Sequence, residues 1–326
     1  MKFYITQLTI LLVLFVKFAV GQSDPQFTQF YSNPLYQAPS FAGAVEGSRV
    51  SLNYRDQWPA MPGKLTTASL AVDYNVSALN SGLGIIVMQD RIGSADLTNL
   101  NVGFLYAYNV KINRKTFFRP GLGFFYTQRS LDYSKLVFAS EIETGGTSPI
   151  LDSEFANVQT FDGSISGLLI SRNIWMGLTA DHLTMPNVSF TDRVNRLPTK
   201  YTLFGGYRFY KVERLISTKR QSVTISGTYR HQGNSDQLDL GLYWSYDPIL
   251  FGVWYRDLPF VKDLTNRDAI ALLVGYRYEG LSVGYSYDFT VSRLITNTGG
   301  AHEISLIYKF ELEQKKKFKP IPCPSF

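Results

Sequence analysis

The chain has 326 residues, of which 45% are hydrophobic, 18% charged and 15% aromatic, and its formal net charge is +6 at pH 7. Its mean hydropathy is -0.06. Many aromatic residues at near-neutral hydropathy are not typical of a soluble α/β enzyme. The single cysteine, Cys323, excludes an internal disulfide.

The N-terminus predicts an export signal. A basic start precedes an apolar stretch over residues 3–20, which ends in the small residues Ala19-Val20-Gly21 before Gln22. These are the parts of a secretory signal peptide, so we expect residues 1–21 to be removed. Lys17, late in the apolar stretch, leaves an uncleaved anchor helix as the alternative. Lipoprotein processing is not expected, because it requires a cysteine at the cleavage site and none lies there.

Beyond residue 30, apolar residues recur at every second position in segments of about ten residues, which is the period of a half-buried strand. Segment 281–290 illustrates it, because Val283, Tyr285 and Tyr287 alternate with Gly284 and Ser286. Many segments approach the ~9–11 residues that a tilted strand needs to cross a bilayer. The expected strands lie near residues 49–57, 65–76, 82–90, 98–110, 117–128, 158–170, 173–182, 200–210, 221–230, 238–246, 249–256, 268–279, 281–290 and 302–311.

The connections between these segments indicate a barrel. Those after even-numbered strands are mostly short, as at 171–172 and 247–248, with 212–220 a longer exception. Those after odd-numbered strands are longer, above all 129–157. Outer-membrane barrels combine short periplasmic turns with long outer loops. The predicted fold is therefore all-β, a transmembrane antiparallel up-and-down β-barrel of about 14 strands over residues 49–311. A soluble all-β protein is the alternative, because its sheets also alternate.

An even strand count places both chain ends on the side of the short turns, expected to be the periplasm. Residues 22–48 then form an N-terminal periplasmic or plug segment, and 312–326 a basic C-terminal tail. Prolines and aromatic residues in the N-terminal segment favour an ordered segment packed on or in the barrel, with a plain linker as the alternative. The candidate partner-binding or plug residues are Asp24, Pro25, Phe27, Gln29, Phe30 and Asn33.

Polar residues on the other face of the strands are expected to line the lumen. Such residues of mixed charge either line a water-filled pore or form ion pairs that close a narrow barrel. The sequence leaves both possibilities open. The candidates are Asp239, Arg256, Arg277, Glu279, Asp288 and Glu303.

Residues for catalysis or metal binding are not evident. His182, His231 and His302 stand apart from one another, without a metal-ligand spacing. Asp181 and His182 resemble a hydrolase pair with Ser189 as nucleophile, but adjacent strand residues point to opposite faces. We therefore predict no catalytic, cofactor or metal site.

Two glycine pairs, Gly82 with Gly84 and Gly121 with Gly123, are not followed by a helix that could hold a phosphate. They are expected to ease strand curvature or to make room for something packed inside the barrel.

Motifs at both ends of the chain carry a resemblance to a known family. They are Asp24-Pro25-Gln26-Phe27-Thr28-Gln29-Phe30-Tyr31 with Asn33, Leu35, Pro39 and Ala42-Gly43, then Arg49, Tyr54-Arg55-Asp56-Gln57-Trp58-Pro59, Ser69 to Asp73, Gly84, Asp90 and Gly93, and later Gly284-Tyr285-Ser286-Tyr287-Asp288, Gly300-Ala301-His302-Glu303-Ile304-Ser305-Leu306 and Cys323-Pro324-Ser325-Phe326. This pattern resembles the PorP/SprF family of type IX secretion membrane proteins of Bacteroidetes. Ala38-Pro39-Ser40 stands where the family more often has Asn-Pro-Ala.

The resemblance implies an integral outer-membrane component of the type IX secretion and gliding machinery, in contact with outer-membrane lipid. It implies assistance in secretion, and a partner that is a secreted adhesin held at the cell surface by its C-terminal domain. A porin-like channel or secretion conduit is the alternative. A third hypothesis has the basic tail, Lys315 to Lys319 with Cys323, docking on other components of the machinery, although a solvated tail is the plainer interpretation. Nucleic acid is not an expected partner of an exported chain.

Overall fold

The computed structural model describes residues 24–61, 63–132, 136, 155–191, 193–211, 221–256, 269–291 and 298–310. The export signal over 1–21 and the basic tail over 312–326 with Cys323 lie outside these residues, as does most of the connection after residue 132. Among the described residues, none of the helices has the length and apolar character needed to cross a membrane.

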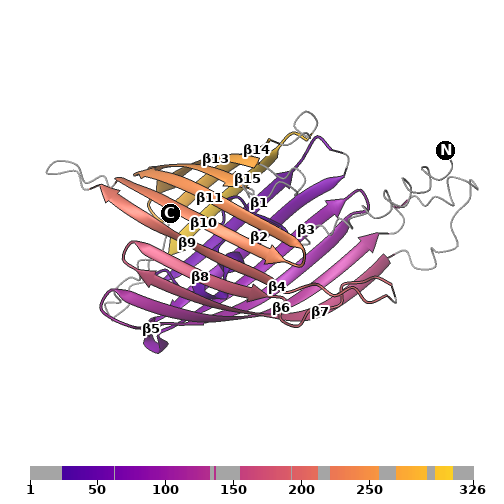
Figure 1. Cartoon of the computed structure of the whole chain (residues 1–326), viewed down its shortest axis with the longest axis horizontal. Helices are drawn as coiled ribbons and strands as arrows, with labels where there is room; N and C mark the ends of the chain where they lie inside the picture. The colour runs from indigo at the N-terminus through magenta and orange to yellow at the C-terminus, as the bar shows by residue number, and fades with distance from the viewer. Residues whose placement is uncertain are drawn as a thin grey trace, which may run out of the picture.

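The described residues form one antiparallel sheet of 15 strands, in which β4 also pairs with β6. The two-residue β5 continues β4 along the same neighbour, so the sheet closes into a barrel of 14 strand positions (Figure 1). This confirms the predicted antiparallel barrel. The strands are β1 (Ser48–Gln57), β2 (Lys64–Val76), β3 (Ser81–Gly93), β4 (Leu97–Tyr108), β5 (Val110–Lys111), β6 (Thr116–Asp132), β7 (Phe155–Ser171), β8 (Ile174–Asp181), β9 (Lys200–Lys211), β10 (Gln221–Gln232), β11 (Ser235–Tyr246), β12 (Ile249–Arg256), β13 (Ala269–Tyr278), β14 (Leu281–Thr290) and β15 (Ala301–Phe310).

The two ends of the barrel differ. At the short-turn end, β2, β7, β11 and β13 each lead into the next strand through a few residues, and η2 (Ser77–Leu79) forms one of these turns. The first and last strands meet here, because Ser48 pairs with Phe310. We call the opposite end the long-connection end, where the chain runs from Asp132 to Phe155 and from Asp181 to Lys200 between strands.

Two connections at the long-connection end are shorter than expected. β3 extends to Gly93 and β4 begins at Leu97, whereas β10 extends to Gln232 and β11 begins at Ser235. Backbone pairing continues past the apolar part of each strand, because a ladder needs no apolar side chains. The alternation of apolar residues therefore does not mark the ends of these strands, where the residues are polar.

The outer face of the wall is apolar. On β13, Ile270, Leu272 and Val274 are each about two-fifths exposed, whereas Ala271 and Leu273 between them are buried. The same alternation runs along the other strands, with exposed tyrosines and tryptophan towards strand ends, such as Tyr74, Tyr108, Tyr201, Trp244, Tyr278 and Tyr308. Aromatic residues at this level suit the lipid headgroup region.

The interior of the barrel is occupied by residues 24–47, which we call the lumen segment. It contains α2 (Pro34–Gln37) and η1 (Pro39–Phe41). Two apolar clusters of buried residues pack inside the wall. One joins Leu35, Ala38, Phe41 and Ala42 to wall residues such as Leu105, Leu168 and Phe204, and the other joins Phe30 and Tyr31 to Tyr243, Trp254 and Leu273.

Candidate functional site

The lumen segment crosses the barrel from one end to the other. Asp24 bonds to His182, directly after β8, and to Lys200, the first residue of β9, at the long-connection end. Gly43 bonds to Asp73 and Asn75, near the end of β2 at the short-turn end. We expected both chain ends on the short-turn side. β1 and β15 do meet there, but Asp24 lies at the opposite end.

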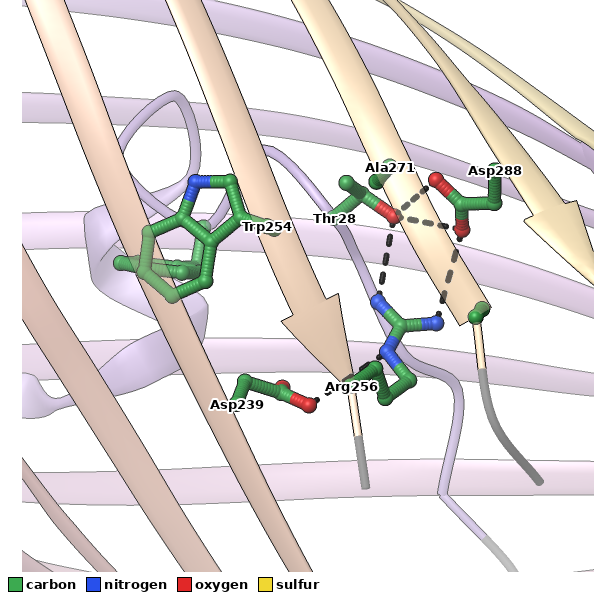
Figure 2. Close-up of a pocket in the computed structure, with 8 residues that line it drawn as sticks. Thr28, Asp239, Trp254, Arg256, Ala271 and Asp288 are labelled. Atoms are coloured by element: carbon green, nitrogen blue, oxygen red, sulfur yellow. Dashed lines mark hydrogen bonds and ion pairs between the residues drawn. The ribbon is translucent and has the colours of Figure 1, made fainter. Parts of the chain in front are cut away.

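Thr28 lies at the centre of a buried charge network (Figure 2). Its hydroxyl donates to Asp288 at 2.7 Å and accepts from Arg55 Nη1 at 2.8 Å and from Arg256 Nη2 at 3.1 Å. Arg55 Nη2 also lies 2.7 Å from Asp288 Oδ2. A buried charge is tolerated when it is paired and hydrogen-bonded, and here the lumen segment supplies part of that bonding.

Glu303 of β15 holds the main chain of the lumen segment. Its carboxylate accepts the backbone N–H of Thr28 at 2.7 Å and that of Gln29 at 2.9 Å, and it is fully buried. The Gln29 side chain completes the contact, because its amide donates to the Glu303 carbonyl and its oxygen accepts from Ser305. Charge-assisted bonds of this kind are about twice as strong as neutral ones.

The network continues to β10 and β11. Arg230 Nη1 lies 2.6 Å from Asp239 Oδ2, and Arg256 Nε lies 3.5 Å from Asp239 Oδ1. Gln237 donates to Asp239 and accepts from Gln26 of the lumen segment. Thr28, Trp254 and Arg256 line a small pocket beside this network.

A second charged cluster binds the first described residue, Asp24. His182 lies with Nε2 2.9 Å from Asp24 and Nδ1 2.6 Å from Asp162, and Lys200 Nζ lies 2.7 Å from Asp24 and 3.4 Å from Asp181. A protonated imidazole donates from both nitrogens, which suits two carboxylates. We call these five residues the mouth latch.

The latch shifts the ionisation of its members. Burial alone lowers the pKa of His182, but Asp24 and Asp162 reverse this effect and raise it to about 9. Burial also opposes the ionisation of Asp24, but Lys200 and His182 outweigh it and hold its pKa well below the ordinary value of 3.8. Both groups are therefore charged near neutral pH.

The short-turn half of the lumen segment is held through its main chain. Arg119 Nε donates to the Ser40 carbonyl at 3.0 Å, and Asp73 Oδ2 accepts the Gly43 N–H at 2.9 Å. A Cβ placed at Gly82 would lie 1.9 Å from the Ala42 carbonyl oxygen, and one at Gly121 would lie 2.3 Å from the Ser40 nitrogen. These strand glycines make room for the segment.

The candidate N-terminal residues contact the wall or, in the case of Pro25 and Phe27, Tyr36 of the lumen segment itself. Besides Asp24 and Gln29, Asn33 donates to Ser69, Phe27 packs edge-on against Tyr36, and Phe30 packs edge-on against Trp254 with ring centroids 4.4 Å apart. The carbonyl of Pro25 accepts the hydroxyl of Tyr36.

Four of the six polar wall candidates lie together, and the other two do not. Asp239, Arg256, Asp288 and Glu303 belong to the buried network around Thr28. Arg277 stands apart, near the short-turn end of β13, and lines a separate cavity with Tyr31. Glu279 differs from expectation: it is exposed in the turn after β13 with φ of 51°. β13 ends at Tyr278, so the alternation of the strand does not extend to Glu279.

Sequence reasoning missed several residues of the site. Arg55 and Arg119 are buried charged residues. Arg55 stands in the motif 54–59 without an assigned role, Arg119 has no signal beyond alternation, and Lys200 has none beyond its place at the start of an expected strand. The sequence predicts no functional role for His182, yet it joins the latch. Ser189 bonds to Thr191 in the exposed connection. No group of three His, Cys, Asp or Glu residues within the described ranges is suited to a metal ion.

An antiparallel barrel with an apolar outer face and a segment of its own chain in the lumen defines a bacterial outer-membrane β-barrel protein. Similar solved structures include Acinetobacter baumannii outer membrane protein Omp33 (7% identity, TM-score 0.46, covering 82% of this chain and 100% of that chain). They also include the Pseudomonas putida toluene transporter TodX (11% identity, TM-score 0.46, covering 90% of this chain and 96% of that chain). A third is a Pseudomonas aeruginosa FadL homologue (13% identity, TM-score 0.42, covering 81% of this chain and 90% of that chain).

Residues 19–308 match the model of a family described as type IX secretion system membrane protein PorP/SprF. The chain therefore belongs to the PorP/SprF family, which confirms the resemblance carried by its N-terminal and C-terminal motifs. A search among curated proteins finds no matching relative. This family and this fold are those of a membrane component of secretion and not of an enzyme class.

Proposed function

We propose that this outer-membrane protein assists type IX secretion and holds secreted adhesins at the cell surface through their C-terminal domains, in support of gliding. The observation that carries the proposal is the occupied lumen, where the wall binds both the backbone and the side chains of the lumen segment. A barrel filled in this way presents its ends to a partner and not its interior. Long connections beside a rigid barrel are a common place for binding.

The proposal includes the orientation of the barrel. The long-connection end faces outward, because outer-membrane barrels carry their longer loops on that side. Export depends on the signal over residues 1–21. The adhesin then meets the connections that follow β6, β8 and β12, while the short-turn end and the basic tail face the periplasm, where other components of the machinery can bind.

The test is capture of the partner. The tagged protein, purified in detergent from outer membranes, is expected to bring down one or a few secreted proteins with a common C-terminal domain, identified by mass spectrometry. Membranes from a strain with the untagged protein are the control. Deletion of the gene is expected to release the same adhesin from the surface. Capture of no secreted protein, together with normal surface retention after deletion, would contradict the proposal.

A substrate conduit is the second candidate. The ionisable groups around Thr28 favour it, because Arg55, Arg256, Asp288 and Glu303 would line an aqueous passage if the lumen segment moved. Steady conductance of the intact protein in planar bilayers would favour the conduit over the adhesin holder.

A further inference from the structure

The connection between β8 and β9 folds into a hairpin at the long-connection end. Val188 N–H donates to the Asn195 carbonyl at 2.9 Å, and Leu197 N–H donates to the Pro186 carbonyl at 3.0 Å. We call residues 182–199 the mouth hairpin. Its exposed part includes Val194, of which 69% is exposed.

The mouth hairpin rests on the wall through a residue that belongs to neither the latch nor the lumen segment. Arg129 of β6 donates from Nη1 to the Val188 carbonyl at 3.0 Å, and its guanidinium lies 5.5 Å from the centre of the Phe190 ring. Arg129 Nε donates to Asn99 of β4 at 2.9 Å, which fixes the arginine on the wall. Arg129 therefore supports the outer part of the hairpin, whereas Leu183 and Thr184 bond its base to β7.

The two partners of Asp24 stand at the two ends of this hairpin. His182 is its first residue, and Lys200 directly follows its last residue, Thr199. The Thr199 hydroxyl donates to the His182 carbonyl at 3.2 Å, which ties the two ends together. A displacement of the hairpin thus acts directly on His182, whereas Lys200 stays in the sheet between Asp181 and Gln232.

The two halves of the lumen segment are held differently. The half that begins at Asp24 depends on charged side chains at the mouth, and His182 and Asp24 are 18% and 14% exposed. The half around Ser40 is fully buried and is bound by Arg119 through its carbonyls. Thr28 and Gln29 are held separately by the buried network and by Glu303. Loss of the latch therefore frees residues 24–26 and leaves the rest of the lumen segment in place.

We propose that the mouth hairpin is a release lever: a partner that binds it at the long-connection end breaks the mouth latch and frees residues 24–26 from the lumen wall. The proposal rests on the proposed function for the identity of the partner, but not for the lever itself. Besides its own members Asp162 and Asp181, the charged and titratable groups around the latch are Arg230 and Tyr36. Asp162, Asp181 and Arg230 belong to the wall and Tyr36 to a deeper part of the lumen segment, so none of them moves with Asp24 when the latch opens.

The lever can be tested without the partner. In a Cys323→Ser background, Gln26→Cys reports on the first half of the lumen segment and Ser40→Cys on the second, through their rates of reaction with a maleimide in isolated outer membranes. Asp24→Asn is expected to raise the rate at position 26 about tenfold, since bonds to charged groups are lost, and to leave the rate at position 40 unchanged.

Arg129→Gln is the decisive variant, because it alters the hairpin support and none of the contacts of Asp24. It is expected to raise the rate at position 26 as Asp24→Asn does, and the double variant is expected to add little, as for coupled residues. Arg91→Gln, at an exposed arginine of β3, is the matched control and should have no effect. An unchanged rate in Arg129→Gln, with the Asp24→Asn effect present, would overturn the lever.

Two further readouts separate the possible failures. Heat-dependent migration of each variant on gels shows that the barrel is folded, and His182→Asn provides a second way to open the latch if Asp24→Asn fails to fold. Adhesin capture is measured on the same membranes. Absent capture with an intact Arg129→Gln effect would contradict the proposed function only, whereas intact capture without that effect would contradict the lever only.

Discussion

Thr28 shows how one small side chain links the lumen segment to the wall. Its hydroxyl lies between the guanidinium groups of Arg55 and Arg256 and the carboxylate of Asp288. Removing one partner from a buried charged network leaves the others incompletely bonded. The residue is thus important for stability although it carries no charge.

Thr28→Val keeps the volume of the side chain and removes the hydroxyl. We expect a loss of about 1–3 kcal/mol in the free energy of unfolding, the cost of leaving buried polar groups unsatisfied. Urea unfolding followed by tryptophan fluorescence measures it, because Trp254 packs on Phe30 of the same segment. Thr28→Ser keeps the hydroxyl and should unfold like the wild type. Equal stabilities for Val and Ser would contradict the role of the network.

The mouth latch predicts a pH dependence. The pKa of His182 is raised from 6.5 to about 9, so its contribution is complete below pH 6.5 and is lost as the pH rises through about 9. Because the pKa of Asp24 is lowered from 3.8, its contribution is present above that pH and is lost in acid. The latch is therefore strongest between about pH 4 and 6.5.

We expect the maleimide rate at Gln26→Cys to rise between pH 6.5 and 9 relative to the rate at Val194→Cys, which corrects for thiol ionisation. His182→Gln should abolish this relative rise. A relative rise of equal size in His182→Gln would assign the pH dependence to another group.

Pairings of single residues were the least predictable part of the site. Alternation alone selected Asp239, Arg256, Asp288 and Glu303 for the inner face, and the structure joins these four in one network with Thr28. Their partners could not be read from the sequence, because Thr28 and Asp288 are separated by 260 positions. Such contacts depend on the register of many strands and on the path of the lumen segment.

At the scale of elements, strand positions were predictable and the character of their inner face was not. β12 and β14 coincide with the expected segments, since alternation and turns mark both ends. We expected a polar inner face, yet Leu250, Trp254 and Leu273 are buried inside. The nearly unbroken apolar run 249–255 indicates the apolar inner face, because apolar residues on both faces are typical of a strand that is covered on both sides.

Gly82 and Gly121 position the lumen segment by leaving space. Alanine at either position places a methyl group within 2.5 Å of the segment backbone, so we expect a loss of about 1–3 kcal/mol from overpacking and faster proteolysis of the segment. Gly163→Ala is the matched control, because the nearest atom to its Cβ lies 3.8 Å away. Limited proteolysis of outer membranes compares the three variants. Equal cleavage of all three would contradict the close packing.

For the whole molecule, the lumen segment decides whether the barrel conducts. We expect the intact protein to show no steady conductance in planar bilayers and a variant without residues 24–43 to conduct, because 14 strands approach the size at which side chains no longer fill the interior. Thr28→Ser, which keeps the lumen segment and its hydroxyl, is the control and should show no steady conductance. A closed deletion variant that still migrates as a folded barrel would show that the wall collapses on itself.

The barrel seam between β1 and β15 carries a consequence for assembly. Arg55 and Glu303 are directly opposite across this seam, and Glu303 is also the residue that binds the backbone of Thr28 and Gln29. The bonds of Glu303 to Thr28 and Gln29 therefore form only when β15 has arrived. Closure of the wall thus coincides with completion of the bonds around Thr28, so a chain that stalls before β15 is left open at its side and incompletely bonded in its lumen.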